Sequence, residues 1–382
     1  MRTTVVAPSE LGAAELATWR GFQRADPALD NPFLAPDFTI AVGEVRPRTR
    51  VAVLEEGGRI VGFLPFEPRG LGYGVAVAPG LSDCQGLVHA PGAEWSPREL
   101  LRSCGLAVWD FDHLLVGQQP FVPFHTLHVP SPVIDLSGGY DSWWAQRSAA
   151  SSRLRDLDRR GRRLAREVGE VRFDFDARDP QALRALMRWK SAQYQRTGRT
   201  DRFAQGWVVE LLDRLLDTRA EGCTGRLSVL RAGDELVAAH FGLSSGTVLP
   251  TWFPTYDPRF ARSSPGLLLH RGMAGAAAAA GIPAIDMGPG HKDYKELLKT
   301  HDAVVAEGRV ARPSAAAGLH WARRTPVRRL RHTVTTNPVL FRSADRVLKA
   351  YGRLSHAAPA GRAPAVNGAA PVSPTGPAAG RD

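Results

Sequence analysis

The segment Arg262-Ser263-Ser264-Pro265-Gly266 has the residue types of an anion-binding loop. It follows an apolar run that ends near Tyr256 and precedes an Ala- and Leu-rich helical segment that starts at Leu267. The unpaired amides and the dipole at a helix start attract anions, the glycine permits a close approach and the arginine adds charge. The loop and Leu267 therefore predict a pyrophosphate site. The alternative is a simple helix start, with one of the serines as cap and the proline at the first position.

A carboxylate lies within a short apolar segment that should be buried. Asp286 is part of Ala284-Ile285-Asp286-Met287-Gly288, where an unpaired charge is costly. Asp286 could orient Tyr294 or Lys295. With a raised pKa, its carboxylate could instead accept a proton from a substrate amine. The alternative is a structural aspartate bonded to the backbone of the glycines that follow it.

Further polar residues are candidates for contacts with a bound substrate. Asp83 and Gln85 lie in a Gly-rich loop, and they could equally be turn formers. Lys190 lies on an apolar helical stripe, where a lysine must reach the edge of the stripe or pair with an acid. If Lys190 has a functional role, Gln193 would face the same substrate cleft. His240 lies inside an apolar strand, as a core histidine or as a base.

These residues are distributed over alternating helical and strand patterns. We expect strands over 50–54, 60–66, 71–78, 113–117, 227–231, 236–242, 248–253 and 285–288, with turns at 56–59 and 232–235. We expect helices over 8–24, 97–108, 151–168, 180–194, 207–218 and 266–280. This order of elements is typical of an α/β fold in which mixed sheets are flanked by helices.

The net charge of +11 arises from a C-terminal extension. Twelve Lys or Arg residues and one acid lie between Arg309 and Arg362, whereas the remaining charges balance. We predict an N-terminal lobe over 1–150, a C-terminal lobe over 151–310, a basic helical extension over 311–355 and a disordered tail over 356–382. Basic and apolar residues alternate in the extension, which is typical of peripheral binding to an anionic membrane; packing of its helices on the second lobe is the alternative.

Composition also argues against several classes of protein. Three scattered cysteines, Cys84, Cys104 and Cys223, predict neither a disulfide framework nor a metal site, and indicate a reducing, cytoplasmic location. The sequence shows no signal-peptide pattern and no apolar stretch of membrane-spanning length. Arginine runs could contact phosphates, but without a base-reading motif we expect no nucleic-acid function.

Several short motifs follow one another between about residues 19 and 310: Asn31-Pro32-Phe33, Gly62-Phe63-Leu64-Pro65, Ser82-Asp83-Cys84-Gln85-Gly86, Ile134-Asp135-Leu136, Lys190-Ser191-Ala192-Gln193-Tyr194, Asp201-Arg202-Phe203, Tyr256-Asp257, Ser264-Pro265-Gly266, Ile285-Asp286-Met287-Gly288 and Tyr294-Lys295. In this order they resemble the BioF2-like, or CelD/BcsL-type, acetyltransferases. Those are tandem GNAT proteins related to the FemABX peptidoglycan aminoacyltransferases.

The resemblance implies two GNAT-like lobes, with acetyl-CoA or another acyl-CoA held by the second lobe. The acceptor, an amine or hydroxyl such as that of a saccharide or cell-envelope precursor, would lie in the cleft, with Trp252 and Tyr256 among its contacts. Lys295, paired with Tyr294, would stabilise negative charge on the tetrahedral intermediate; a surface lysine is the alternative. FemABX relatives use aminoacyl-tRNA, so that donor and a non-catalytic binding protein remain alternatives.

Overall fold

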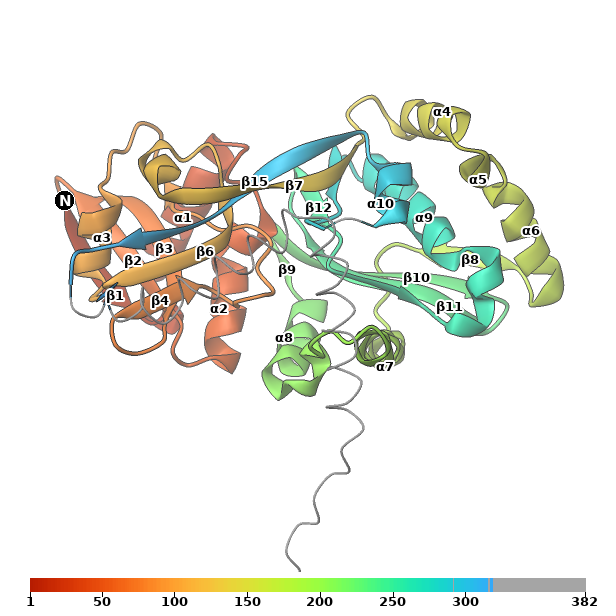
Figure 1. Ribbon diagram of the computed structural model, residues 1–382, viewed down its shortest axis with the longest axis horizontal. Helices are drawn as coiled ribbons and strands as arrows, with labels where there is room; N and C mark the ends of the chain where they lie inside the picture. Colours follow the sequence, from red (N-terminus) through yellow and green to blue (C-terminus); the bar gives the residue numbers. More distant parts are fainter. Residues whose placement is uncertain (291, 315–316, 319–382) are drawn as a thin grey trace, which may run out of the picture.

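The computed structural model describes residues 1–290, 292–314 and 317–318. The extension predicted over 311–355, apart from its first residues, and the tail over 356–382 lie outside the described residues. Within the described part, a mixed sheet and an antiparallel sheet are flanked by helices, so the α/β fold class predicted from the sequence is confirmed (Figure 1).

The N-terminal half carries the larger share of the first sheet. Its strands are β1 (Arg2–Val6), β2 (Arg50–Glu56), β3 (Arg59–Pro68), β4 (Tyr73–Ala76), β5 (Val88–His89), β6 (Val108–Leu115) and β7 (His125–Asp135). Its α-helices are α1 (Ala13–Ala25), α2 (Pro36–Val45) and α3 (Pro97–Ser103), with 3-10 helices at Pro8–Glu10, Pro32–Leu34 and Gln119–Phe124.

The C-terminal half begins with three helices and continues with a second sheet. Its helices are α4 (Tyr140–Ala150), α5 (Ser152–Arg155), α6 (Leu157–Glu167), α7 (Pro180–Arg196), α8 (Gly206–Leu216), α9 (Pro265–Ala279) and α10 (Asp293–Leu298), with 3-10 helices at Arg202–Ala204 and Pro258–Ser263. Its strands are β8 (Val171–Asp174), β9 (Arg219–Ala220), β10 (Cys223–Ala232), β11 (Glu235–Ser244), β12 (Val248–Pro250), β13 (Phe253–Tyr256), β14 (Ala284–Asp286) and β15 (His301–Ala311).

The first sheet runs through both halves of the molecule. Its strand order is β1-β2-β3-β4-β6-β15-β7-β14-β12, with β5 paired to β3. β15, the last described strand, lies between β6 and β7, and Figure 1 shows β7 and β15 side by side from one half to the other. The second sheet, in the order β13-β11-β10-β8 with β9 on β10, belongs to the C-terminal half alone.

A shared apolar core fixes the two halves relative to each other. One cluster of buried side chains combines Trp19, Phe33 and Phe38 of the first half with Leu211 and Trp252 of the second. The Trp252 indole N–H also donates to the carbonyl of Leu81 at 2.8 Å. This core holds the loops of both halves against one another, which a site built from both requires.

Most sequence-based elements are confirmed, and two are wrong in instructive ways. The predicted helix 97–108 ends at Ser103, because Gly105 adopts a left-handed conformation (φ 67°) and the chain then enters β6. The predicted strand 248–253 is two strands, β12 and β13, which pair in different sheets. Within the described residues, no helix is both long enough and apolar enough to cross a membrane.

Candidate active site

The split between β12 and β13 creates an opening in the C-terminal half. β12 pairs in parallel with β14, whereas β13 pairs only with β11. Thr251, at the point of divergence, still donates its amide to the carbonyl of Asp286 at 2.7 Å. Beyond it, the other edge of β13 has no strand partner among the described residues. The Pro254 carbonyl of β13 already accepts a hydrogen bond from Lys190, and the other backbone groups on the free edge are available to a ligand.

Helix α9 begins beside this free edge. Ser264 precedes it in a left-handed conformation (φ 53°), Pro265 occupies the first helical position, and neither neighbouring serine caps the helix with its side chain. Instead, the Ser264 hydroxyl accepts a hydrogen bond of 3.0 Å from Arg160. The amide of Gly266 makes no backbone hydrogen bond within the described chain. A strained residue and a free amide at a helix start are the features of an anion-binding turn.

A pocket of about 300 Å³ lies at this helix start. Eight of the residues predicted from the sequence line it: Lys190, Gln193, Tyr256, Ser264, Pro265, Gly266, Leu267 and Tyr294. Arg262 and Ser263 of the predicted loop do not line it; the Arg262 side chain is exposed and Ser263 is buried. The loop thus contributes through its C-terminal part and the first turn of α9.

Six residues of the pocket were not anticipated from the sequence, and three of them are ionisable: Arg153, His270 and Lys292. His270 donates from Nδ1 to the carbonyl of Gly266 at 2.6 Å, so Nε2 carries the lone pair. Burial lowers the pKa of His270 to about 4, and Nε2 has no partner among the described residues. The four-residue spacing from Gly266, which puts both on one helix face, was the available signal.

Lys295 is buried rather than part of a solvated lysine patch. Only 6% of the residue is exposed, and its Nζ donates to the carbonyls of Gly288 at 2.7 Å and Pro289 at 3.2 Å. Burial and the repulsion of Lys292 lower the pKa of Lys295 to about 8. An ammonium has three donors, so one N–H remains for a ligand.

Tyr294, the other member of the predicted pair, lies on the pocket side of α10. Its ring centroid is 5.1 Å from that of His270, and burial raises its pKa to about 12. The phenol is therefore neutral at physiological pH.

Asp286 organises the turn that holds Lys295. Its Oδ1 accepts hydrogen bonds from the Ser131 hydroxyl at 2.5 Å and from the Gly288 amide at 2.8 Å. These contacts match the structural alternative considered for this aspartate. Asp286 is not among the pocket-lining residues.

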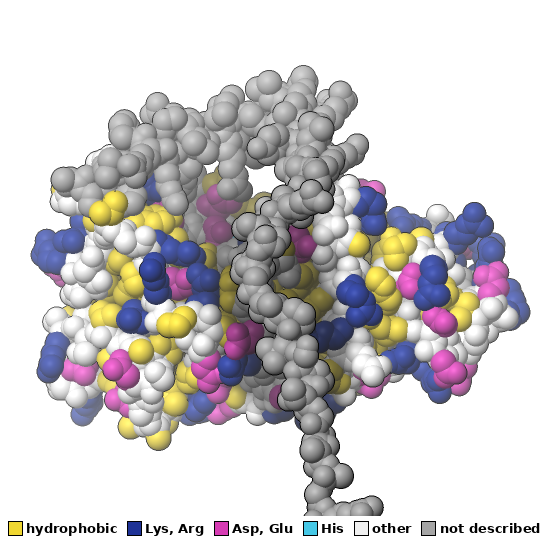
Figure 2. Space-filling view, turned by 90° about the horizontal axis from the view of Figure 1, so that it is seen from below, with side chains coloured by type: hydrophobic (Ala, Val, Ile, Leu, Met, Phe, Trp, Pro, Cys, Tyr) yellow, Lys and Arg dark blue, Asp and Glu magenta, His cyan; other side chains and the backbone are white. Residues whose placement is uncertain are grey.

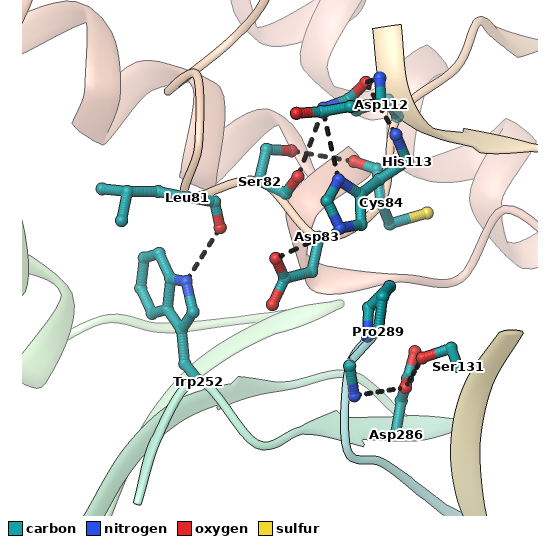
Figure 3. Close-up of polar contacts among 12 residues, drawn as sticks. Leu81, Ser82, Asp83, Cys84, Asp112, His113, Ser131, Trp252, Asp286 and Pro289 are labelled. Atoms are coloured by element: carbon teal, nitrogen blue, oxygen red, sulfur yellow. Dashed lines mark hydrogen bonds and ion pairs between the residues drawn. The ribbon is translucent and has the colours of Figure 1, made fainter. Parts of the chain in front are cut away.

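Asp83 and His113 of the N-terminal half face this turn (Figure 3). The Asp83 Oδ1 lies 3.9 Å from Nε2 of His113, whose Nδ1 is 3.0 Å from a carboxylate oxygen of Asp112. On the opposite side, Oδ2 of Asp83 would be 3.8 Å from a β-carbon placed on Gly288. Asp112 and His113 were not singled out from the sequence.

Burial is the largest single influence on the pKa of each residue, but it decides the direction of the shift only for Asp83. It raises the pKa of Asp83 to about 6 against the attraction of His113, although 26% of the Asp83 side chain can still be reached by solvent. Burial alone would lower the pKa of His113, but its hydrogen bond to Asp112 and the charge of Asp83 raise it overall. Asp83 can therefore exchange a proton near neutral pH.

Gln85 braces the loop that carries Asp83. Its Nε2 donates to a carboxylate oxygen of Asp112 at 2.6 Å, and its Oε1 accepts from the amides of Asp112 at 3.0 Å and His113 at 3.3 Å. With the residue only 3% exposed, these contacts account for its amide group. Gln85 thus connects two segments of the N-terminal half.

The remaining predicted residues have different positions. Trp252 packs in the shared core, and His240 is fully buried in β11; neither lines the pocket. Lys190 neither reaches the surface nor pairs with an acid; its Nζ donates to the Pro254 carbonyl at 2.8 Å, 5.7 Å from the Tyr194 ring centroid. Burial, followed by the repulsion of Lys292, lowers the pKa of Lys190 to about 7.

Comparisons with known proteins agree with this architecture. A family model described as an acetyltransferase (GNAT) domain matches residues 151–296. The crystal structure of FemX is similar, with a TM-score of 0.53 and 10% identity, covering 81% of this chain and 96% of that one. The C-terminal domain of a protein described as a lysylphosphatidylglycerol synthetase from Agrobacterium fabrum gives a TM-score of 0.50 at 13% identity, covering 80% and 96%.

A search of curated protein sequences finds no significant match. At these low identities the two solved structures support the fold alone. The matched segment of the family model contains all the residues that line the pocket. The segment 151–296 is thus similar to a GNAT acetyltransferase domain, within a chain whose fold resembles that of FemX over most of its length.

Proposed function

We propose that this protein transfers an acyl group from acyl-CoA, most simply acetyl-CoA, to an amine or hydroxyl by direct attack in a ternary complex. The observation that carries the proposal is the free start of α9, at Gly266, opening into a pocket beside the unpaired edge of β13. The lobe over 151–310 would bind the donor, and the lobe over 1–150 would complete the acceptor side of the cleft.

In this proposal the donor's phosphates bind at the first turn of α9. Gly266 offers its amide there, and two arginines are close, because Arg153 lines the pocket and Arg160 is bonded to Ser264. The pantetheine arm would follow the free edge of β13 toward Lys295, whose remaining N–H would stabilise the oxyanion. Catalysis would depend on positioning and on this electrostatic contact.

Asp83 is the proposed proton acceptor. As the amine or hydroxyl attacks the thioester carbon, its proton passes to Asp83; collapse of the tetrahedral intermediate then breaks the C–S bond and releases CoA. A covalent cysteine intermediate is disfavoured, because burial raises the pKa of all three thiols, for Cys104 to about 12.

The acceptor class rests on the sequence resemblance to BioF2-like and CelD/BcsL-type proteins, which favours a saccharide or cell-envelope precursor. Peripheral contact with an anionic membrane through 311–355 remains a proposal from the sequence.

Aminoacyl-tRNA is the second candidate donor. One observation favours it: the arginine-rich helices α5 and α6 lie beside the donor loop, where Arg160 contacts both Arg262 and Ser264. A large polyanion could bind along such a surface.

A thermal-shift comparison of the full chain with acetyl-CoA, aminoacyl-tRNA and no ligand distinguishes these candidates, since a ligand of the native state raises the melting temperature. We expect stabilisation by acetyl-CoA. Stabilisation by aminoacyl-tRNA alone would identify aminoacyl-tRNA, and not acyl-CoA, as the donor. No change of melting temperature with either ligand would favour a non-catalytic binding protein.

A further inference from the structure

Positive charge gathers on one side of the pocket, where two lysines line the wall and an exposed arginine contributes from outside it. Lys190 projects from α7, Arg199 follows the end of that helix, and Lys292 directly precedes α10. Lys190 and Lys292 both line the pocket. None of the three forms an ion pair with another residue in the described part of the chain.

The directions of the pKa shifts agree with an excess of positive charge here. Burial lowers the pKa of Lys190 most, and each charged group that adds to the shift, Lys292, Arg199 and Lys295, is a cation. Burial and then Arg199 lower the pKa of Lys292. Lys295 differs, because Asp286 and Asp83 partly offset the repulsion that it experiences.

A nearby lysine shows the usual arrangement. Lys299, seven residues after Lys292, pairs with Glu296 at 2.9 Å and with Asp302 at 2.8 Å. Lys190 is only 7% exposed and has a backbone carbonyl as its hydrogen-bond partner. Buried like charges without counter-ions are unfavourable, so such a group is typical of a site completed by an anionic ligand.

The cations are close to the proposed reacting end of the donor. Lys295, the proposed oxyanion partner, is one of the charges that Lys190 experiences, and Lys190 is bonded to Pro254 on β13. The proposed phosphate site of the donor lies on the same pocket, at the start of α9, with Gly266 and Arg160. If that site holds the donor's phosphates, Lys190 and Lys292 remain for a second anion. An anion at Lys190 would thus belong to the molecule that meets the thioester.

We propose that Lys190 and Lys292 bind a phosphate group carried by the acceptor substrate, which would therefore be a phosphorylated saccharide or a similar phosphate ester. The assignment to the acceptor rests on the proposed acyl-CoA function. A phosphate is favoured over a carboxylate because its charge of about −2 matches the charge of the two lysines. Its oxygens can also accept several charge-assisted hydrogen bonds.

The test uses the full chain saturated with CoA, so that the donor's own phosphate site is filled. Glucosamine 6-phosphate and glucosamine form a matched pair of probes, and inorganic phosphate is the minimal one; binding is followed by thermal shift. We expect stabilisation by glucosamine 6-phosphate and inorganic phosphate, weakening at high salt, and none by glucosamine.

Substitutions test whether the two lysines are responsible for phosphate binding. Lys190→Met and Lys292→Met should each weaken phosphate binding at least tenfold while CoA affinity stays within about threefold of wild type, and Lys299→Met should bind like wild type. The proposal is overturned if phosphate binding survives both substitutions or competes with CoA. It is also overturned if the CoA-loaded protein does not bind phosphate. A preference for malonyl-CoA over acetyl-CoA that depends on Lys190 overturns it too, because the anion would then belong to the acyl group.

The experiment distinguishes failure of the donor assignment from failure of the anion site. If CoA does not bind but phosphate does so through Lys190 and Lys292, the donor assignment is wrong and the anion site stands.

Discussion

The ammonium of Lys295 donates a 2.7 Å hydrogen bond to the carbonyl of Gly288, and the amide of that same glycine is held by Asp286. One turn therefore connects the buried lysine to β14 and, through Ser131, to β7. Asp83 from the other half faces this turn. The proposed reaction centre is fixed by both halves of the chain, and each contribution can be removed separately.

Replacement of Lys295 by methionine should remove the proposed oxyanion donor. We expect turnover, followed as release of CoA thiol from acetyl-CoA, to fall by ~10²-fold or more, with CoA affinity nearly unchanged. Lys299→Met, on the same helix end but ion-paired at the surface, is the matched control. A Lys295→Met enzyme as active as the control would show that this lysine has no part in the chemistry.

The pH dependence of turnover should report Asp83 and Lys295. Asp83, with a pKa of about 6, must lose its proton to act as a base, and Lys295, with a pKa of about 8, must keep its proton. We therefore expect a bell-shaped profile with limbs near these values. Asp83→Asn should lower the plateau and remove the acidic limb. An unchanged acidic limb in that variant would assign it to another group.

Lys190→Met should stabilise the protein in the absence of ligand. Substitution removes a buried cation from the repulsion of Lys292 and Arg199, at the cost of one hydrogen bond, so we expect a gain of about 1 kcal/mol at pH 7. Chemical denaturation with Lys299→Met as control measures it. A clear loss of stability would mean that the bond to Pro254 outweighs the repulsion.

The same lysine predicts how stability depends on pH. Its folded pKa of about 7 lies below that of the unfolded chain, so the unfolded state binds more protons between the two values. The contribution of Lys190 to stability should therefore rise from pH 7 toward pH 10, and this rise should be reduced in Lys190→Met. Identical pH slopes for the two proteins would exclude a lowered pKa.

The helix start at which we propose the donor site was predictable from sequence because it is local. A loop of small residues followed by an Ala- and Leu-rich segment places Ser264, Pro265 and Gly266 without any knowledge of the rest. The split of 248–253 was not predictable, because both pieces have strand composition and only their partners, β14 and β11, differ.

The acid–base side of the site depends on long-range register. His113 approaches Asp83 because residues 85 and 114 form a parallel bridge and Gln85 bonds to the backbone of β6. No sequence spacing encodes that contact. Lys190 was recognised as anomalous on its apolar stripe, but its cationic neighbours come from 199 and 292, which only the fold brings together.

The balance of charge on the described surface supports the importance of this local cluster. Figure 2 shows basic and acidic side chains interspersed over one face of the molecule. Near the pocket, in contrast, the cations lack acidic partners.

The central claim, that acyl-CoA binds at the first turn of α9, is tested most directly by calorimetric titration of CoA into the Gly266→Val variant. A β-carbon at this position would lie 3.6 Å from the nearest atom, on the Tyr256 ring, an ordinary contact, so the fold should persist while the added side chain blocks the approach to the amide. Gly206→Val, in the first turn of α8 with no atom within 4 Å of its β-carbon, is the matched control. The account predicts wild-type CoA affinity in Gly206→Val and at least tenfold weaker binding in a folded Gly266→Val; equal affinity in the two variants would contradict it.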